Sequence, residues 1–363
     1  LFRLFYLQNN TSMRPATPAE IENWDTMLLE KASPHILQTR VWGECKRACG
    51  WQPLYLWEET TATPILLLKK QLPLTGKSLL YVPKGPAADF QTKSSDRTVL
   101  VRNLLSYVCG ELAKREKAML VKVECEATED DAEIRQVFID HHCLPSDLHP
   151  QFKHTMWLDL TLSDTALLDS FKSKTRYNIR LAQKKNIQIK TEVDEPSLRL
   201  FFQIHKSTGR SGNFPVRTYT YYERVWKSLI DRDMATLFLA YHEGDLLGGV
   251  LLFGFGNRLY YQYGASSPVK RNYMANYLLQ WTAMQWGKQY GFAIYDLVGL
   301  PEQPDPQDPF YGVWNFKQGF QGETKKFLGA FDYYPKDSDQ KFWRWYASVY
   351  KRYLWYLHRD IIF

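Results

Sequence analysis

The segment Ser170–Lys190, SFKSKTRYNIRLAQKKNIQIK, concentrates positive charge in a pattern suited to binding phosphates. Its basic residues are not interrupted by any acidic residue from Lys172 onward. Lys172, Arg176, Arg180 and Lys184 follow one another at i, i+4, which places them on one ridge of a helix. Like charges at this spacing repel by roughly a few tenths of a kcal/mol per pair. The ridge is therefore interpreted as facing a nucleic-acid backbone, and a solvated helix face is the alternative.

Several common catalytic motifs are missing from the chain. No G-x-x-x-x-G-K-S/T phosphate loop and no G-x-S-x-G nucleophile elbow occurs. The five cysteines, Cys45, Cys49, Cys109, Cys125 and Cys143, fit no zinc-binding spacing. We therefore expect neither a metal nor a cofactor, and the odd number of cysteines favours free thiols in a reducing compartment.

The elements that must position these residues follow the same order in both halves of the chain. In each half, helices precede an antiparallel set of strands, and one more helix and one more strand follow. The first half has expected helices at Pro18–Leu29, Arg40–Cys49 and Ser95–Lys114, and expected strands at Pro53–Glu58, Ile65–Lys70, Ser78–Val82 and Met119–Cys125. The second half has expected helices at Asp164–Lys185, Glu195–Ser207 and Met274–Tyr290, and expected strands at Thr155–Leu160, Ala235–Tyr241, Leu246–Phe255, Arg258–Gly264 and Phe292–Val298. This order predicts an α/β (α+β) protein of two tandem GNAT-like domains with a cleft between them.

The chain length of 363 residues also suits two domains. The segment His149–His154 interrupts the pattern, so the first domain is expected to cover residues 1–152 and the second 153–335. The tail, 336–363, reads as one aromatic and basic helix that packs back on the first domain. No apolar stretch reaches the ~18 residues that a membrane-spanning helix needs, which favours a cytoplasmic protein.

Four segments, taken in order, resemble motifs of the FemABX family of peptidoglycan bridge-forming enzymes. The basic segment resembles the family's K-S-K-T-R-x-N-I-R-x-A stretch. The others are Ser33–Trp51 (SPHILQTRVWGECKRACGW), Tyr81–Pro86 (YVPKGP) and Phe310–Leu328 (FYGVWNFKQGFQGETKKFL). Together they span nearly the whole chain. The chain resembles compact, FemX-like members, because Lys190 runs into the next helix without the inserted coiled-coil arm of other members.

The resemblance implies an aminoacyltransferase of two GNAT-like domains. Such enzymes take an amino acid from aminoacyl-tRNA and attach it to the stem-peptide amine of a precursor, either UDP-MurNAc-pentapeptide or lipid II, and so build the interpeptide bridge. The implied partners are therefore aminoacyl-tRNA and a peptidoglycan precursor, and the implied role is in cell-wall biogenesis and cell shape.

The resemblance also implies roles for particular residues. By motif position, Lys46 and Arg217 resemble the lysine and arginine that bind the precursor's phosphates in compact relatives. Tyr221 and Tyr263 resemble tyrosines that line the same cleft. An exposed helical lysine, a local ion pair and core-edge tyrosines are the structural alternatives. We expect Arg217 to lie in a loop rich in polar and aromatic groups.

The same reasoning assigns the catalytic candidates Lys317 and Phe316, in NFKQGF. The corresponding lysine of relatives lies near the aminoacyl ester, where a fixed cation stabilises developing negative charge, and the phenylalanine could stack on a terminal base. An aminoacyl ester is already activated, so direct attack by the acceptor amine is the simplest scheme. Asp296 is a candidate base and equally a candidate structural carboxylate.

Two other functions fit parts of the sequence. An acyl-CoA N-acyltransferase of the GNAT fold would hold pyrophosphate at Lys270–Ala275, although Tyr273 takes the position of a glycine there. A non-catalytic RNA- or membrane-binding protein would use the basic ridge and the tail. The interleaved aromatic and basic residues of Lys341–Arg359 suit peripheral contact at the inner face of a membrane, and packing against the first domain is the alternative.

Overall fold

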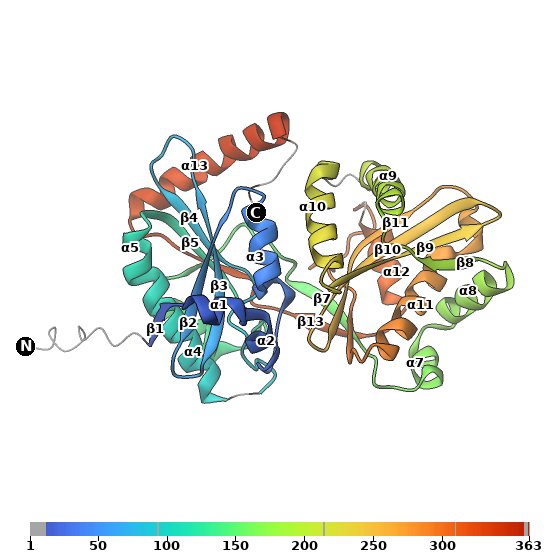
Figure 1. Ribbon diagram of the computed structural model, residues 1–363, viewed down its shortest axis with the longest axis horizontal. Coiled ribbons are helices and arrows are strands. Elements are labelled where there is room, and N and C mark those ends of the chain that lie inside the picture. Colours follow the sequence, from blue (N-terminus) through green and yellow to red (C-terminus); the bar gives the residue numbers. More distant parts are fainter. Residues whose placement is uncertain (1–11, 93, 213–214, 309, 359–361, 363) are drawn as a thin grey trace, which may run out of the picture. The chain divides into compact units, whose positions relative to one another are not determined.

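The computed structural model describes residues 12–92, 94–212, 215–308, 310–358 and 362 (Figure 1). These residues form two compact units. The first contains the described residues up to Gln151 together with Phe327–Arg352, and the second contains Phe152–Lys326 with the described residues from Tyr353 onward.

The first unit is built on a sheet with the strand order β1-β2-β3-β4-β5-β14-β6. Its strands are β1 (Met13–Pro15), β2 (Gln52–Glu58), β3 (Thr63–Gln71), β4 (Ser78–Val82), β5 (Ala118–Glu124), β6 (Leu144–Pro145) and β14 (Ala330–Tyr333). All neighbours are antiparallel except β4 and β5, which run parallel. Its helices are α1 (Pro18–Glu22), α2 (Trp24–Leu29), α3 (Arg40–Arg47), α4 (Ser95–Tyr107), α5 (Ala113–Arg115), α6 (Ala132–Asp140) and α13 (Asp337–Tyr353), with a π-helical turn at Val108–Leu112.

Helices cover both faces of this sheet (Figure 1). One face packs on α4 and α6, because alternate strand residues such as Leu80, Val82, Val121 and Val123 share a core with them. Helices α2 and α3 pack on β2 and β3 from the other face. That second face carries the polar side chains of the site described below.

The second unit has a sheet with the strand order β13-β7-β12-β11-β10-β9-β8. Its strands are β7 (His154–Asp159), β8 (Gln188–Thr191), β9 (Ala235–His242), β10 (Asp245–Phe255), β11 (Arg258–Ser266), β12 (Ile294–Asp296) and β13 (Glu323–Lys326). Here β11 and β12 form the parallel pair. The helices are α7 (Asp164–Ser170), α8 (Ser173–Lys184), α9 (Glu195–Ser211), α10 (Tyr219–Ile230), α11 (Ala275–Gln289) and α12 (Tyr311–Gln318).

The two faces of the second sheet differ in character. Helices α8 and α11 share an aliphatic core with one face, through residues such as Ile179 and Leu279. Helices α9 and α10 lie on the other face, where Phe201, Trp226 and Tyr263 form an aromatic cluster. Strand β8 leads into α9 within a few residues, as expected for a chain that lacks an inserted arm.

Three of the differences between the structure and the predicted elements concern where elements end and which domain they belong to. The single helix expected at Pro18–Leu29 is two helices, α1 and α2, that meet at Asn23. The helix expected at Asp164–Lys185 is interrupted at Phe171–Lys172, which separates α7 from α8. The second domain does not extend to residue 335 as expected, because β14 pairs with β5 and belongs to the first sheet.

Candidate active site

In the first unit, a buried glutamine joins two of the sequence motifs. Gln38 Nε2 donates to the carbonyl oxygens of Leu66 (3.1 Å) and Pro83 (2.7 Å), and its Oε1 accepts from the Leu66 amide (2.8 Å). Gly85 lies directly against this side chain, since a Cβ there would come within 2.6 Å of the Gln38 amide. The glutamine of SPHILQ and the glycine of YVPKGP therefore have structural roles.

The turn that contains Gly85 also directs a lysine toward a buried carboxylate. Lys84 adopts a left-handed φ of 48°, and its Nζ lies 3.6 Å from Glu124 Oε1 and 4.6 Å from the ring centroid of Phe327. Tyr81 donates its hydroxyl to Glu124 Oε2 (2.9 Å). Neither Lys84 Nζ nor Glu124 Oε1 is hydrogen-bonded to a residue that the structure describes. Burial raises the pKa of Glu124, and the Lys84 charge opposes that rise.

A second charged residue lies next to Glu124 on the same face of β5. Lys122 donates to Ser146 Oγ, to the Leu148 carbonyl (2.9 Å) and to Asp332 Oδ1 (2.5 Å). Burial lowers the pKa of Lys122, opposed by Asp332. Neither this lysine nor Glu124 is among the residues predicted from the sequence. The sequence feature that could have identified them is their alternation with valines in MLVKVEC. This alternation puts two charged residues on one face of a strand that is buried on both faces.

Lys46, which is predicted to bind the phosphates of the precursor, lies in the same unit. It occupies the last turn of α3 and is 6% exposed, so it is not an exposed helical lysine. Its ammonium lies 5.2 Å from the Trp42 ring centroid. Lys70, 8% exposed, is placed over Trp51 at the same distance. Two lysine ammonium groups are thus held against indole rings in this unit, which is a favourable cation–π arrangement.

In the second unit, the parallel strands β11 and β12 separate part-way along their length. They pair from Arg258–Ile294 to Tyr260–Asp296, after which β11 continues to Ser266 paired with β10 alone. A bulge at Gln262 interrupts the β10–β11 register. The chain after β12 turns away through Val298 and Gly299, both with positive φ.

Lys317 of α12 occupies this separation. Its Nζ donates to the carbonyls of Val298 and Gly299 (2.8 Å to the latter) and lies 5.7 Å from the ring centroid of Tyr261 on β11. Burial lowers its pKa from 10.5 to about 8, and Asp296 opposes the shift. A lysine ammonium has three N–H donors, and the two carbonyls accept from two of them, so the third remains for another acceptor.

The neighbouring candidate, Phe316, belongs partly to the core. Its ring packs edge-on against Tyr277 (4.9 Å between centroids) and against Phe320 (5.3 Å). The side chain is half-buried, so part of its surface is accessible for contact with a ligand.

The structure brings Arg217, Tyr221 and Tyr263 together. The Arg217 guanidinium lies 4.2 Å from the Tyr221 ring centroid, and Tyr222 contacts the rings of both Tyr221 and Tyr263. Arg217 precedes helix α10 and lies in a loop as predicted, and Tyr221 lies on that helix. His205 of α9 packs against Tyr263, and burial lowers its pKa to about 4, so it is neutral at pH 7.

Asp296 is a structural carboxylate. Its Oδ1 accepts from the Thr155 hydroxyl and from the Val298 amide (2.9 Å), and its Oδ2 accepts from the Trp157 indole (2.9 Å). Arg258 lies 3.9 Å from Oδ2. Of the two roles considered from the sequence, these four contacts favour the structural one, because a base needs an oxygen facing its substrate.

The predicted basic ridge is only partly helical. Lys172 is the N-cap of α8 with extended dihedral angles, while Arg176, Arg180 and Lys184 lie on the helix itself. Arg176 turns back and donates to the carbonyls of Asp169 (3.1 Å) and Phe171, which closes the end of α7. Lys172, Arg180 and Lys184 are exposed. The predicted ridge is therefore helical from Arg176 onward, whereas Lys172 caps the helix, and contact of these cations with tRNA stays a prediction.

In the loop proposed for the CoA pyrophosphate, one of the two cations, Lys270, is already paired with carboxylates. Lys270 Nζ lies 3.0 Å from Glu243 Oε2 and 3.0 Å from Asp245 Oδ2. Tyr273 is half-buried, with its ring 4.9 Å from the His242 ring and 5.0 Å from Lys185 Nζ. Both features weaken the CoA alternative.

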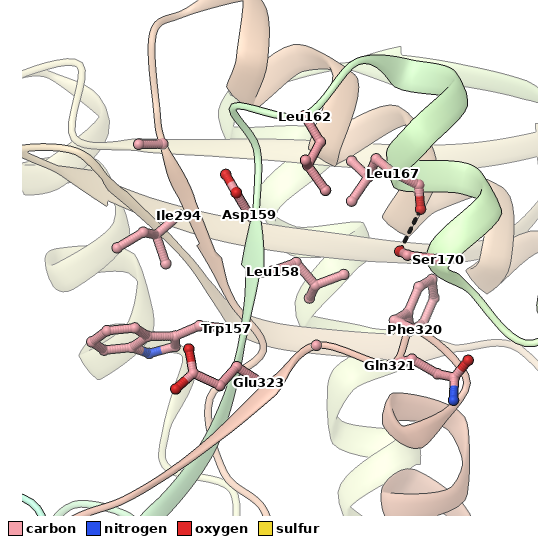
Figure 2. Close-up of a pocket in the computed structure, with 12 residues that line it drawn as sticks. Trp157, Leu158, Asp159, Leu162, Leu167, Ser170, Ile294, Phe320, Gln321 and Glu323 are labelled. Atoms are coloured by element: carbon pink, nitrogen blue, oxygen red, sulfur yellow. Dashed lines mark hydrogen bonds between the residues drawn. The ribbon is translucent and has the colours of Figure 1, made fainter.

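A cavity of about 390 Å³ lies elsewhere, at the C-terminal end of β7. Figure 2 shows Trp157 and Glu323 on one side of this strand and Leu158, Leu167 and Ser170 on the other. None of the predicted site residues lines it. Two cationic groups already lie over the Trp157 indole, Arg258 at 4.2 Å and Lys325 at 5.0 Å from its ring centroid.

The described residues also bear on two broader classes of function. No group of three or more His, Cys, Asp or Glu side chains within the described ranges is arranged to hold a metal ion. Over the same ranges, no helix has both the length and the apolar character needed to cross a bilayer.

Comparison with known proteins places the chain in a family. The FemAB family model matches residues 19–245 and 241–347. The lipid II:glycine glycyltransferase of Staphylococcus saprophyticus subsp. saprophyticus is 25% identical over 378 residues, covering 84% of this chain and 89% of the relative. The crystal structure of FemX superposes with a TM-score of 0.80 at 22% identity, covering 92% of this chain and 99% of FemX. A tandem GNAT protein from the clavulanic acid biosynthesis pathway gives a TM-score of 0.51 at 12% identity, covering 89% and 98%.

These likenesses confirm the predicted fold class of two GNAT-like α/β domains. The family match covers most of the chain and includes all four of the motifs singled out in the sequence. The chain belongs to the FemAB family.

Proposed function

We propose that this chain is an aminoacyltransferase that moves an amino acid from aminoacyl-tRNA to the stem-peptide amine of a peptidoglycan precursor. Family membership and relatives named as lipid II:glycine glycyltransferases support a transferase acting in bridge formation. The observation that carries the chemistry is Lys317, a buried lysine fixed by two backbone carbonyls where β11 and β12 separate.

The proposed reaction needs no additional energy source. The acceptor amine nitrogen attacks the ester carbonyl carbon, an amide bond forms, and the bond from that carbon to the ribose oxygen breaks. The proton lost by the amine ends on the ribose oxygen that leaves. Lys317 would stabilise the negative charge that develops on the carbonyl oxygen or the leaving oxygen, because a preorganised cation in a buried site is effective there.

Four of the predicted residues would bind the acceptor. Lys46 and Arg217 supply charges for the precursor's phosphates, and Tyr221 and Tyr263 form a wall beside Arg217. The Lys84–Glu124 pair is a further candidate for contact with the acceptor peptide. Lys84 Nζ and Glu124 Oε1 face each other at 3.6 Å, each without a hydrogen bond to a described residue, and a polar group of the acceptor would supply those bonds.

The tRNA would be held largely through its phosphates. Lys172, Arg180 and Lys184 are exposed cations at the start and along one side of α8. Contacts of this kind position a nucleic acid without reading its sequence. The choice of amino acid would then depend in part on which charged tRNA is supplied.

The test is to incubate the protein with mixed charged tRNAs and either UDP-MurNAc-pentapeptide or lipid II, and to measure the product mass. An increase equal to one amino-acid residue, absent with uncharged tRNA, is the expected result. A parallel reaction with acyl-CoA tests the acyltransferase alternative. Binding of RNA or vesicles without any transfer would favour the non-catalytic alternative.

A further inference from the structure

Helix α13 presents two different faces. Asp339, Trp343, Tyr346 and Tyr350 are buried. Lys77 pairs with Asp339, and the Tyr346 hydroxyl donates to the Pro73 carbonyl (3.2 Å), so this face is anchored on the first unit near the β3–β4 turn. The aromatic residues of this face are therefore explained by packing.

The remaining large apolar residues of α13 are not explained by that packing. Phe342, Trp345 and Val349 are 41%, 61% and 49% exposed. Tyr353, at the end of the helix, is 47% exposed. With about 100° of rotation per residue, these four fall within an arc of about 80°. Large apolar side chains gathered on one side of a surface helix mark an interaction site.

Basic residues lie beside this exposed stripe and beyond it: at 100° per residue, Lys341 and Arg352 fall within about 40° of its edge, and Arg344 and Lys351 about 100° to 120° from it. Lys341, Arg344, Lys351 and Arg352 are all exposed, whereas Asp337 is the exposed acid of the helix. In the part of the chain that the structure describes, Lys341, Lys351 and Arg352 have no carboxylate partner, and Arg344 has only Asp147 at 4.0 Å. Aromatic rings beside unpaired cations fit the interface of an anionic bilayer, where rings lie at headgroup depth and cations meet lipid phosphates.

We propose that α13 docks this protein on the surface of an anionic membrane through Phe342, Trp345 and Val349 and the cations beside them. The inference rests on the proposed function, because a docked enzyme would meet a lipid-linked acceptor at that surface. Docking would raise the local concentration of such an acceptor and would leave transfer to a soluble acceptor unchanged.

Vesicle flotation tests this docking. The wild-type chain is expected to float with vesicles of equimolar phosphatidylglycerol and phosphatidylcholine, and much less with phosphatidylcholine alone. Phe342→Glu with Trp345→Glu should lower the bound fraction at least tenfold. A variant with Lys341, Arg344, Lys351 and Arg352 changed to Gln should lose the preference for anionic vesicles. The control Tyr177→Glu with Tyr290→Glu alters aromatics of similar exposure, 63% and 67%, on α8 and after α11, and should bind as wild type does.

Transfer to UDP-MurNAc-pentapeptide, together with the thermal unfolding midpoint, shows whether each variant is folded. Retained transfer without flotation supports docking through α13. Failure of the wild type to float, or an equal decrease in the control, overturns the inference and leaves the proposed function standing. Weaker tRNA affinity instead of weaker vesicle binding in the charge variant also overturns it. Flotation without transfer to any acceptor would contradict the proposed function alone.

Discussion

At the scale of single residues, the ionisation of Lys317 connects the structure to the proposed chemistry. A lysine whose pKa is about 8 is mostly protonated at pH 7, so the cation that the mechanism needs is present. Transfer should therefore decline as the pH rises through about 8, and Lys317→Met should be slow at every pH. Rates measured from pH 6.5 to 9 test this, corrected for spontaneous ester hydrolysis. A wild-type profile that stays flat above pH 8 would exclude a role for the ammonium.

The lowered pKa of Lys317 also makes the stability of the fold depend on pH. The folded pKa of about 8 lies below the unfolded value of 10.5, so the unfolded chain binds the proton more tightly between these values. Stability therefore rises with pH across that window, by about 3 kcal/mol at ~1.36 kcal/mol per pKa unit. Urea unfolding of the wild type and Lys317→Met from pH 7 to 10 should show a rise in the wild type that the variant lacks. Parallel curves would mean that Lys317 is not a buried ammonium.

The acceptor-binding residues make a separate prediction. Lys46→Ala and Arg217→Ala each remove a charge-assisted contact worth about 1.5–3 kcal/mol, so the acceptor KM should rise by roughly 10- to 150-fold. Affinity for tRNA should stay nearly constant. Arg199→Ala is the matched control, because that guanidinium also lies over a tyrosine ring, 4.5 Å from Tyr219, but is paired with Glu195. An unchanged acceptor KM in both test variants would contradict the assignment.

Residues whose motifs stand out can be predicted from the sequence, whereas those defined by tertiary contacts cannot. Lys317 and Arg217 lie in distinctive segments. Glu124 is one carboxylate among many until folding places it 3.6 Å from Lys84, some forty residues earlier in the chain. Gln38 donates to the carbonyl of Pro83, the residue before Lys84, and so supports the turn in which Lys84 adopts its positive φ and approaches Glu124. No local pattern contains that information.

At the scale of elements, the break between α7 and α8 shows why the sequence predicts one helix where two exist. The segment contains neither proline nor glycine. Phe171 nonetheless leaves the helix, because its ring packs edge-on against Phe320 (5.2 Å) and Trp281 (6.0 Å). The Lys172 amide bonds to the Gly319 carbonyl (2.9 Å). These distant partners, more than local propensity, end α7.

Helix α10 is a different case, because its local signal is present in the sequence although no helix is predicted there. Tyr222, Val225, Trp226 and Leu229 follow the i, i+3, i+4, i+7 spacing of a buried helix face, and all four are buried. The polar and aromatic character of the segment favours a loop. Its helical periodicity is the stronger evidence.

The exposed cations at the start of α8 and along it are predicted to bind the phosphates of tRNA. Changing Lys172, Arg180 and Lys184 to Gln should weaken binding of different tRNAs to a similar degree, because only interactions with phosphates are removed. The slope of log affinity against log salt should fall by a little under ~1 for each phosphate that is no longer neutralised. Arg176 is left unchanged, because it closes the end of α7.

A matched variant in the first unit controls for net charge. Arg102, Lys114 and Arg135 are exposed basic residues there, and changing them to Gln removes the same charge. The control should keep the wild-type slope. Equal slopes for all three proteins would assign the α8 cations to solvent and would require tRNA to bind elsewhere.

At the scale of the whole molecule, the repeated order of elements can be read from the sequence, but the path of the chain between units cannot. The repeat predicts two similar domains, and the fold class is confirmed. Strand β14 nevertheless returns to pair with β5, about two hundred residues earlier, and Asp332 on it holds Lys122. Periodicity identifies a strand but carries no information about a partner so far away in the sequence.

The most direct test of the central claim is the mass of the precursor after incubation with charged tRNA. The wild-type chain should add one amino-acid residue to UDP-MurNAc-pentapeptide or to lipid II, and Lys317→Met should add it far more slowly while remaining folded. A precursor whose mass does not change with any charged tRNA, or changes only when acyl-CoA is supplied, would contradict the claim.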